Sequence, residues 1–321
     1  MKSISLLQLA RLAGVSKTTV SLILNGKSDR YKISSSTKRR VLNLAAENNY
    51  KPNILARNLS MGKSMTVGVI VPDMKDHDNS ILVGAIEQEL FAAGYQMVLG
   101  ISGNDEEKRG KLLPEMTERK VDGVLYISRG DRMFNVTDVE IPLVSIGEFS
   151  EDHSSVTIDA DAGVKKIIGY WYPRGRRTMG YVGLSKRNEN VKKSFHENYI
   201  ERFSMKDDRL FLLNDQFDEK KMKQHLLSIA KKGINAVFFE TPLLAFQALK
   251  ILKGQDMPGF EDVAVGSFGY HPSFDVVQRE IIYVTKPLER MAEEGTGLLF
   301  DLMTGKQDEI IHKKAEPLFL F

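Results

Sequence analysis

The sequence of 321 residues contains no cysteine, so disulfide bonds, thiolate metal ligands and cysteine nucleophiles are excluded together. No run of residues approaches the roughly 20 consecutive apolar residues that a membrane-spanning helix needs. The amino-terminal stretch also lacks the apolar core and the small-residue cleavage site of a secretion signal. We therefore expect a cytoplasmic protein.

Sequence motifs for catalysis and for cofactor binding are missing as well. The six histidines show no metal-binding spacing, and neither Gly-x-Ser-x-Gly nor a dinucleotide-binding glycine pattern occurs. The GKS at 62–64 imitates the end of a phosphate-binding loop, but Arg57 stands where that loop requires glycine. We predict that the protein is not an enzyme and uses neither a cofactor nor a metal.

The net charge of +3 hides a strong asymmetry along the chain. Residues 1–63 hold 12 Lys/Arg against two Asp/Glu, a net charge of +10, whereas residues 64–321 hold 33 against 40, a net charge of −7. The basic residues of the first segment are interleaved with apolar positions at helical spacing, so this segment is expected to fold rather than to form a solvated tail. A small basic head of this kind suits binding to a phosphate backbone.

Three helices are predicted in the head. Leu6, Leu9 and Ala13 share one helix face, and Gly14 stops that helix. Ser16 is a suitable N-cap for a second helix to about Asn25, and a third begins at Ser34–Ser36 and ends near Asn49. A short fourth helical segment is predicted at 54–60, with Asn53 as a possible cap.

A different pattern starts at Met65, where apolar runs alternate with helical stretches of about 10–15 residues. The runs, which are typical of buried parallel strands, are 66–72, 95–101, 121–127, 141–147, 178–184, 235–240 and 263–268. The helical stretches are 79–93, 105–119, 161–172, 191–204, 219–232 and 243–253. This alternation indicates a doubly wound α/β body.

Residues 9–26, LARLAGVSKTTVSLILNG, have the pattern of a helix-turn-helix with its turn at Gly14. In this motif the second helix enters the major groove, and its early residues meet base edges. Lys17 and Thr18 would occupy those places, with Leu22 one turn later. Thr19, Ser21 and Asn25 are short polar residues suited to phosphate oxygens. Helix–glycine–helix corners also occur in proteins that do not bind DNA, so the motif alone is only moderately specific.

Together with the residues that follow it, the motif resembles the lactose/galactose-repressor (LacI/GalR) family of bacterial regulators. The resemblance rests on ARLAGVSKTTVSLILNG, on Ile33, Ser34 and Thr37, on RRVLNLAAENNYKPNILARNL (39–59) and on VGVIVPD (67–73). Leu22 and a hairpin expected at 26–34 are similar to the sucrose, fructose and trehalose branch. The resemblance implies DNA contacts from residues of the second helix and the following hinge: Ser16, Lys17, Thr18, Thr19, Ser21, Leu22, Asn25, Tyr50, Asn53, Arg57 and Leu59.

In this family the hinge segment becomes helical on the operator, and a leucine at the position of Leu59 wedges into the minor groove. Such a wedge partly unstacks a base step and kinks the DNA. The expected fold is α/β: an all-α helix-turn-helix head and a two-lobed periplasmic-binding-protein-like body with doubly wound parallel sheets. The expected domains are a head at 1–50, a hinge helix and linker at 51–64, and an effector-binding and dimerisation body at 65–321. Its first lobe would span about 65–158 plus 286–313, and its second about 159–285 plus 314–321.

Ligands of open α/β sheets bind beyond the carboxyl ends of the strands. The resemblance and this rule together give the candidate effector-binding residues His77, Asp78, Asn79, Arg129, Glu148, Lys192, Lys193, Thr241, Gly269 and Lys286. The chain departs from the usual family pattern at Gly147-Glu148, Phe195, Thr241-Pro242 and Gly269. Among the candidates, Arg129, Lys192, Lys193 and Lys286 are basic and suit a phosphate, although each could equally be a solvated surface residue.

The resemblance implies a homodimer that binds an inverted-repeat operator. We expect a repressor of a carbohydrate uptake or catabolic operon, modulated by a small sugar or sugar phosphate. Two alternatives stay open at this point. The body could sense a protein partner rather than a metabolite, or the chain could be a cytoplasmic sugar-binding protein without a regulatory role.

Overall fold

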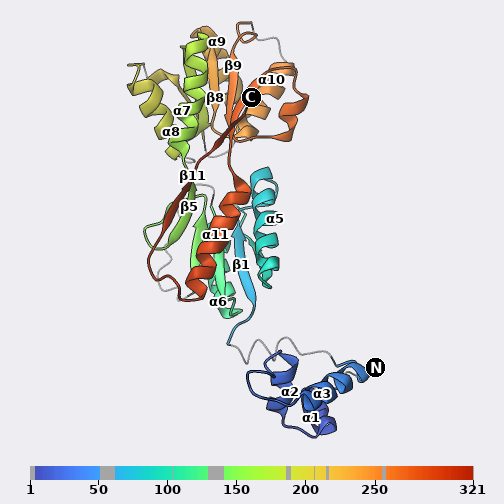
Figure 1. The fold of residues 1–321 in the computed structure, drawn as a ribbon. Coiled ribbons are helices and arrows are strands. Elements are labelled where there is room, and N and C mark those ends of the chain that lie inside the picture. Colours follow the sequence, from blue (N-terminus) through green and yellow to red (C-terminus); the bar gives the residue numbers. More distant parts are fainter. Residues whose placement is uncertain are drawn as a thin grey trace. The chain divides into compact units, whose positions relative to one another are not determined.

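The computed structural model describes residues 4–50, 62–103, 105–128, 141–185, 189–205, 207–214, 217–254 and 258–320. The chain forms two compact units, residues 1–64 and 65–321, which we call the head and the body (Figure 1). Within the described ranges, no helix combines the length and the apolar character needed to cross a membrane.

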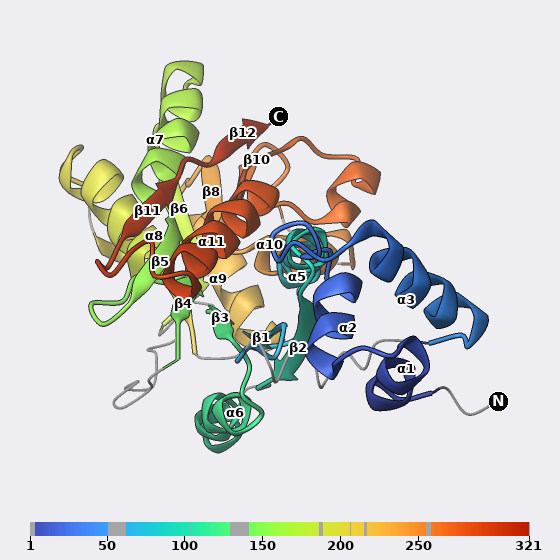
Figure 2. The same ribbon diagram turned by 60° about the horizontal axis from the view of Figure 1, so that its bottom comes forward.

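Three short helices make up the described part of the head (Figure 2): α1 (Leu6–Ala13), α2 (Lys17–Leu24) and α3 (Ser35–Glu47). A serine caps the start of each, because Ser5, Ser16 and Ser34 accept hydrogen bonds from backbone N–H groups in the first turn. The helices pack around a small core that contains the fully buried side chains of Leu9, Val20 and Val41. The three predicted head helices are therefore present.

The expected hairpin at 26–34 is wrong. This segment folds into successive turns, in which Tyr31 donates its N–H to the Lys27 carbonyl at 3.3 Å and Ile33 donates to Ser28 at 3.0 Å. No strand occurs within residues 4–50. The physical reason is local: the segment lacks the alternation of apolar and polar residues that holds a strand pair, and Ser28 is fully buried within the turns.

The first lobe of the body contains a wholly parallel sheet, with the strand order β11-β5-β4-β3-β1-β2. Its strands are β1 (Thr66–Val71), β2 (Gln96–Ile101), β3 (Gly123–Ile127), β4 (Leu143–Ile146), β5 (Ser154–Ile158) and β11 (His312–Ala315). Helices α5 (His77–Ala92) and α11 (Leu288–Met303) lie side by side on one face (Figure 1), and α6 (Glu106–Glu118) covers the other.

The second lobe repeats this plan, with the strand order β12-β10-β9-β8-β6-β7. Its strands are β6 (Met179–Leu184), β7 (Leu210–Leu213), β8 (Ala236–Phe239), β9 (Ala264–Phe268), β10 (Ile281–Thr285) and β12 (Leu318–Leu320), of which β12 alone is antiparallel to its neighbour. On one face lie α9 (Glu219–Lys231) and α10 (Pro242–Gly254). On the other lie α7 (Ala160–Trp171) and α8 (Glu189–Phe195).

The doubly wound α/β prediction is confirmed, and all seven predicted strands are found. The sequence reading missed β5, β7, β10, β11, β12 and α11. The helix expected over 191–204 is also different, because α8 ends at Phe195 and a π-helical segment follows over His196–Glu201.

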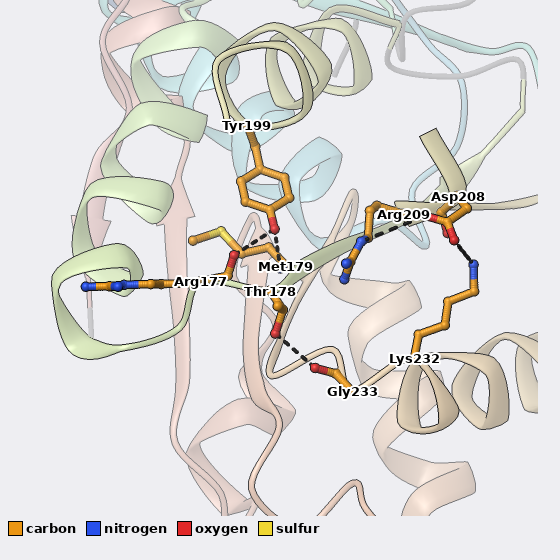
Figure 3. A network of polar contacts seen from close by, with 8 residues as sticks. All are labelled: Arg177, Thr178, Met179, Tyr199, Asp208, Arg209, Lys232 and Gly233. Atoms are coloured by element: carbon orange, nitrogen blue, oxygen red, sulfur yellow. Dashed lines mark hydrogen bonds and ion pairs between the residues drawn. The ribbon is translucent and has the colours of Figure 1, made fainter. Parts of the chain in front are cut away.

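Tyr199 anchors this π-helical segment to the start of β6 (Figure 3). Its hydroxyl donates to the Arg177 carbonyl at 2.8 Å and accepts from the Met179 N–H at 2.7 Å. In the same network, Thr178 donates its hydroxyl to the Gly233 carbonyl at 2.9 Å. The ring of Tyr199 is fully buried. Together with the two hydroxyl bonds, this packing holds the π-helical segment against the start of β6.

Candidate nucleic-acid interface and lobe junction

The first turn of α2 is stabilised locally and leaves its polar side chains accessible. The Ser16 hydroxyl accepts the Thr19 N–H at 3.0 Å and lies 2.8 Å from the Thr19 hydroxyl oxygen. Lys17 and Thr18, which come next, are both exposed. No acidic residue occupies this turn, so the positive end of the helix dipole carries an added lysine charge. The arrangement suits an anionic partner.

The other predicted DNA contacts, along α2 and after α3, differ in their exposure and in their hydrogen bonds. The Asn25 amide donates to the Ser21 hydroxyl at 3.3 Å, and Leu22 is half-buried. Tyr50 packs against the head core, where burial raises the pKa of its phenol. Asn53, Arg57 and Leu59 lie outside the described residues.

The described surface of the head is strongly basic. Residues 4–50 contain only two acids, Asp29 and Glu47, and Asp29 lies 3.6 Å from the Lys38 ammonium group. Seven further basic side chains are exposed, namely those of Arg11, Lys17, Lys27, Arg30, Lys32, Arg39 and Arg40. This surface can bind a polyanion without the large desolvation cost of a buried charge.

In the body, the segments at the carboxyl ends of the strands bring the two lobes into contact. We call residues 72–80, 240–242, 269–275 and 285–288 the lobe junction. In both sheets the strand order reverses next to one of these segments, between β1 and β3 and between β6 and β8. Such switch points are where open α/β sheets hold ligands.

Two of the predicted effector residues pair with each other at the lobe junction. The Asp78 carboxylate on α5 lies 3.0 Å from the ammonium group of Lys286, which follows β10. Beside this ion pair, the His77 ring meets the Tyr270 ring edge-on, with 6.2 Å between the ring centroids. An ionic contact and an aromatic contact therefore both help to join the junction.

Other predicted effector residues hold the local backbone. Asn79 is buried and donates its amide to the Asp73 carbonyl at 2.9 Å, and Thr241 accepts the Leu244 N–H at 3.3 Å near the start of α10. Glu148 accepts the Ser128 hydroxyl at 2.6 Å. Each of these three residues therefore stabilises the local structure through a hydrogen bond within the chain.

Two glycines allow the backbone to turn sharply after a strand. Gly269, after β9, has φ +111°, and a side chain there would meet Pro242 at 2.9 Å. Gly147, after β4, has φ +107°, and a side chain would come within 2.5 Å of the Ser128 carbonyl oxygen. The departures from the family pattern at these positions thus coincide with close backbone approaches.

The basic residues proposed for a phosphate do not all come together. Lys192 donates to the Ser185 carbonyl at 3.4 Å, whereas Lys193 is exposed and lies 3.7 Å from Glu197. Lys286 pairs with Asp78, and Arg129 lies outside the described residues. The Lys192 and Lys193 contacts are made within the second lobe.

The candidate effector residues did not include Glu240, which has a buried carboxyl group just after the end of β8. This residue is 1% exposed. One of its oxygens accepts both the Tyr181 hydroxyl, at 2.9 Å, and the Leu184 N–H, at 2.8 Å. Burial and the neighbouring carboxyl group raise the pKa of Tyr181 well above its ordinary value. The position of Glu240 directly after an apolar run was the only sequence signal for a buried carboxyl group. Its pairing with Tyr181 depends on how β6 and β8 align, which the sequence does not reveal.

Phe195, at the end of α8, is one of the positions expected to depart from the family pattern. Its ring is fully buried and packs against Tyr181 and Tyr199, with centroid separations of 5.4 and 5.3 Å. This position therefore contributes to an aromatic core and offers no polar group to a ligand.

A separate hollow of about 520 Å³ runs along α11 and does not include any of the predicted effector residues. Its lining includes Glu89, Arg290, Glu293, Glu294 and Lys313. In the part of the chain that the structure describes, no cluster of three or more His, Cys, Asp or Glu side chains could hold a metal ion.

Comparisons with known proteins all point to bacterial regulators of the LacI type. Residues 5–53 match the family described as "Bacterial regulatory proteins, lacI family". The chain is 28% identical over 314 residues to the HTH-type transcriptional regulator RegA of Clostridium saccharobutylicum, with 94% of this chain and 93% of RegA covered. Both the matched family and RegA are described as regulatory proteins.

Solved structures share the whole fold. The lac repressor dimer bound to operator and the anti-inducer ONPF superposes with a TM-score of 0.83 at 17% identity, covering 100% of this chain and 98% of that one. The transcriptional regulator CelR in complex with cellobiose gives a TM-score of 0.69 at 22% identity, with 99% and 98% coverage. The head and both lobes are therefore found together in known regulators.

We expect the buried pair of Glu240 and Tyr181 to stabilise the second lobe. Glu240→Ala leaves the Tyr181 hydroxyl and the Leu184 N–H without a partner, and should lower the free energy of unfolding by about 2–4 kcal/mol. Tyr181→Phe should cost about 1–2 kcal/mol, and the double variant less than the sum, because both changes remove the same bond. Urea unfolding followed by fluorescence of Trp171, the only tryptophan, measures this lobe.

Tyr170→Phe is the matched control for this experiment. Its hydroxyl donates to Glu280 at 3.3 Å in an exposed bond, so the change should have little effect. Strict additivity of the two buried substitutions would contradict the pairing.

Proposed function

We propose that the chain is a regulator of the LacI family and a homodimeric repressor of a carbohydrate uptake or catabolic operon, because residues 5–53 match that family and nearly the whole chain is similar to RegA. In this proposal the head binds an inverted-repeat operator, and a sugar or sugar phosphate bound between the lobes changes operator affinity. The observation that carries the proposal is the basic head, in which Lys17 and Thr18 are exposed at the start of a serine-capped helix. The assignment to the sucrose, fructose and trehalose branch stays a prediction from Leu22 and residues 26–34.

DNA recognition is assigned to α2. A helix that enters the major groove meets base edges with its first residues, and Lys17 can donate to the acceptors of guanine. Ser16, Thr19, Ser21 and Asn25 would bind phosphate oxygens and fix the orientation of the helix on the duplex. The lac repressor structure supports this assignment, because that protein is bound to its operator.

The effector is assigned to the lobe junction. CelR, which shares the fold, is described in complex with cellobiose, and this supports a sugar as ligand. The substitutions at Phe195, Thr241 and Gly269 change the polar groups that family members offer, so the ligand of this chain would make its own set of contacts. Lys286 and Asp78 are the charged residues best placed to take part.

The dimer interface is assigned to a face of the first lobe. Large apolar side chains are exposed there on two elements that touch each other: Phe91, at the end of α5, is 75% exposed, and Leu99 and Ile101 on the edge strand β2 are 37% and 39% exposed. Exposed apolar patches of this kind mark protein interfaces, and an edge strand without a cover invites pairing. The likeness to a dimeric repressor supports this assignment.

The recognition helix is tested by Lys17→Ala. We expect the substitution to change which base is preferred at one position of each half-site, at a cost of about 1–3 kcal/mol on the preferred sequence. Selection of bound duplexes from a library of randomised half-sites gives the preference. Lys232→Met, a lysine substitution in the body, should leave the preference unchanged. An equal loss of affinity on every sequence would reduce Lys17 to a phosphate contact.

The dimer face is tested by the pair Phe91→Glu and Leu99→Glu. Charged groups at the centre of an apolar interface remain desolvated and unpaired, so the dimer should dissociate at least about tenfold more readily. Sedimentation velocity over a range of concentrations measures the dissociation. Leu227→Glu alters a leucine of the second lobe that is 46% exposed and should have no effect. A dimer of unchanged stability in the double variant would place the interface elsewhere.

A further inference from the structure

The ion pair between Asp78 and Lys286 is a contact between the lobes. Asp78 belongs to α5 of the first lobe, whereas Lys286 directly follows β10 of the second. Asp78 also lies against the second lobe, because one of its oxygens is 3.9 Å from the point where a side chain on Gly269 would begin. The ion pair therefore lies at the line along which the two lobes meet.

Both ends of the ion pair are held by rigid structure. Asp76 caps α5 by accepting the Asp78 N–H at 3.0 Å, and the buried Asn79 amide ties the helix start to the preceding loop. On the other side, Lys286 stands between the last residue of β10 and Pro287, the N-cap of α11. Because Asp78 lies within α5 and Lys286 directly follows β10, breaking the pair removes a contact between two packed elements.

The pair is also partly shielded from water. The Asp78 side chain is 17% exposed and that of Lys286 is 33% exposed, so their attraction is screened less than that of a surface pair. The carboxylate lies in the first turn of α5, where the helix dipole favours a negative charge. The reduced screening strengthens the attraction, and the helix dipole favours the ionised form of Asp78.

A neighbouring contact supports the same arrangement. The Tyr270 ring that meets His77 packs against Tyr283, with 5.2 Å between the ring centroids, and donates its hydroxyl to Asp275 at 2.5 Å. Tyr270 is therefore fixed within the second lobe, and His77 reaches it from the first. Two adjacent residues of α5 thus touch the second lobe.

We propose that Asp78 and Lys286 form a latch that holds the two lobes in this arrangement without any ligand. The ion pair links the two lobes through side chains of the protein itself. A ligand can shift the lobes only by as much as it favours one arrangement over the other. The latch therefore sets the equilibrium on which any ligand of the junction acts. This inference depends on the body alone and holds or fails independently of DNA binding.

The latch can be tested by distance measurements between spin labels in the full chain, which has no native cysteine. Labels at Glu118→Cys on α6 and Lys250→Cys on α10 report on one lobe each, and both positions are exposed. Labelled protein is mixed with an excess of unlabelled protein so that distances within one subunit dominate. Without the latch, the distribution of distances should become broader and its mean should shift.

Four variants carry the test. Lys286→Met and the nearly isosteric Asp78→Asn should each broaden the distribution, and the double variant should broaden it no further, because either change removes the whole pair. Lys286→Arg should keep the original distribution. The control is Lys232→Met, which removes a pair of 2.6 Å with Asp208 inside the second lobe, from a lysine of similar exposure (34%).

Trp171 fluorescence checks that each variant is folded, since this side chain is 2% exposed in the core of the second lobe. An unchanged distribution in folded Lys286→Met or folded Asp78→Asn overturns the latch. Further broadening in the double variant overturns it as well, because the two residues would then act separately.

Discussion

Three crossings of the chain join the two lobes of the body, and this connection is the constraint on which the account depends. The chain leaves the first sheet after β5, returns from β10 to α11 and β11, and crosses again to β12. Because the parallel strands of both sheets point their carboxyl ends toward these crossings, the switch points and the charged residues gather at one junction. Lys286 lies on one of the crossings, which explains how a single side chain can link a strand of one sheet to a helix on the other.

The head works by a different physical principle. Its core is small, and its stability depends on serine caps and on a few fully buried residues such as Leu9 and Val20. The charge of this unit faces solvent, where it is available to an anionic partner. Sequence reading is sound for such a unit, because caps, the stop at Gly14 and the basic residues are all local signals.

The same reading was less complete in the body. Strands with buried apolar runs could be found, whereas β11, with the sequence HKKA, has no such run and forms because it pairs with β5. For α11 a helical spacing of apolar residues was present at Leu288, Met291, Ala292 and Leu299, so this omission was avoidable. The pairings of Glu240 with Tyr181 and of Asp78 with Lys286 could not be predicted, since they depend on how separate elements align. The sequence predicted ligand binding for residues such as Asp78. The structure shows that these residues also make contacts within the protein, such as the ion pair of Asp78 with Lys286.

The central claim is that the basic head binds DNA through its charge and through α2. The most direct measurement is the affinity of the full chain for a duplex from its own upstream region, followed by fluorescence anisotropy at several salt concentrations. With six or more phosphate contacts, affinity should fall about 10³-fold or more between 50 and 200 mM salt. A duplex of random sequence should bind more weakly and show a similar dependence on salt. Affinity that does not change with salt, or no binding to either duplex at low salt, would contradict the account.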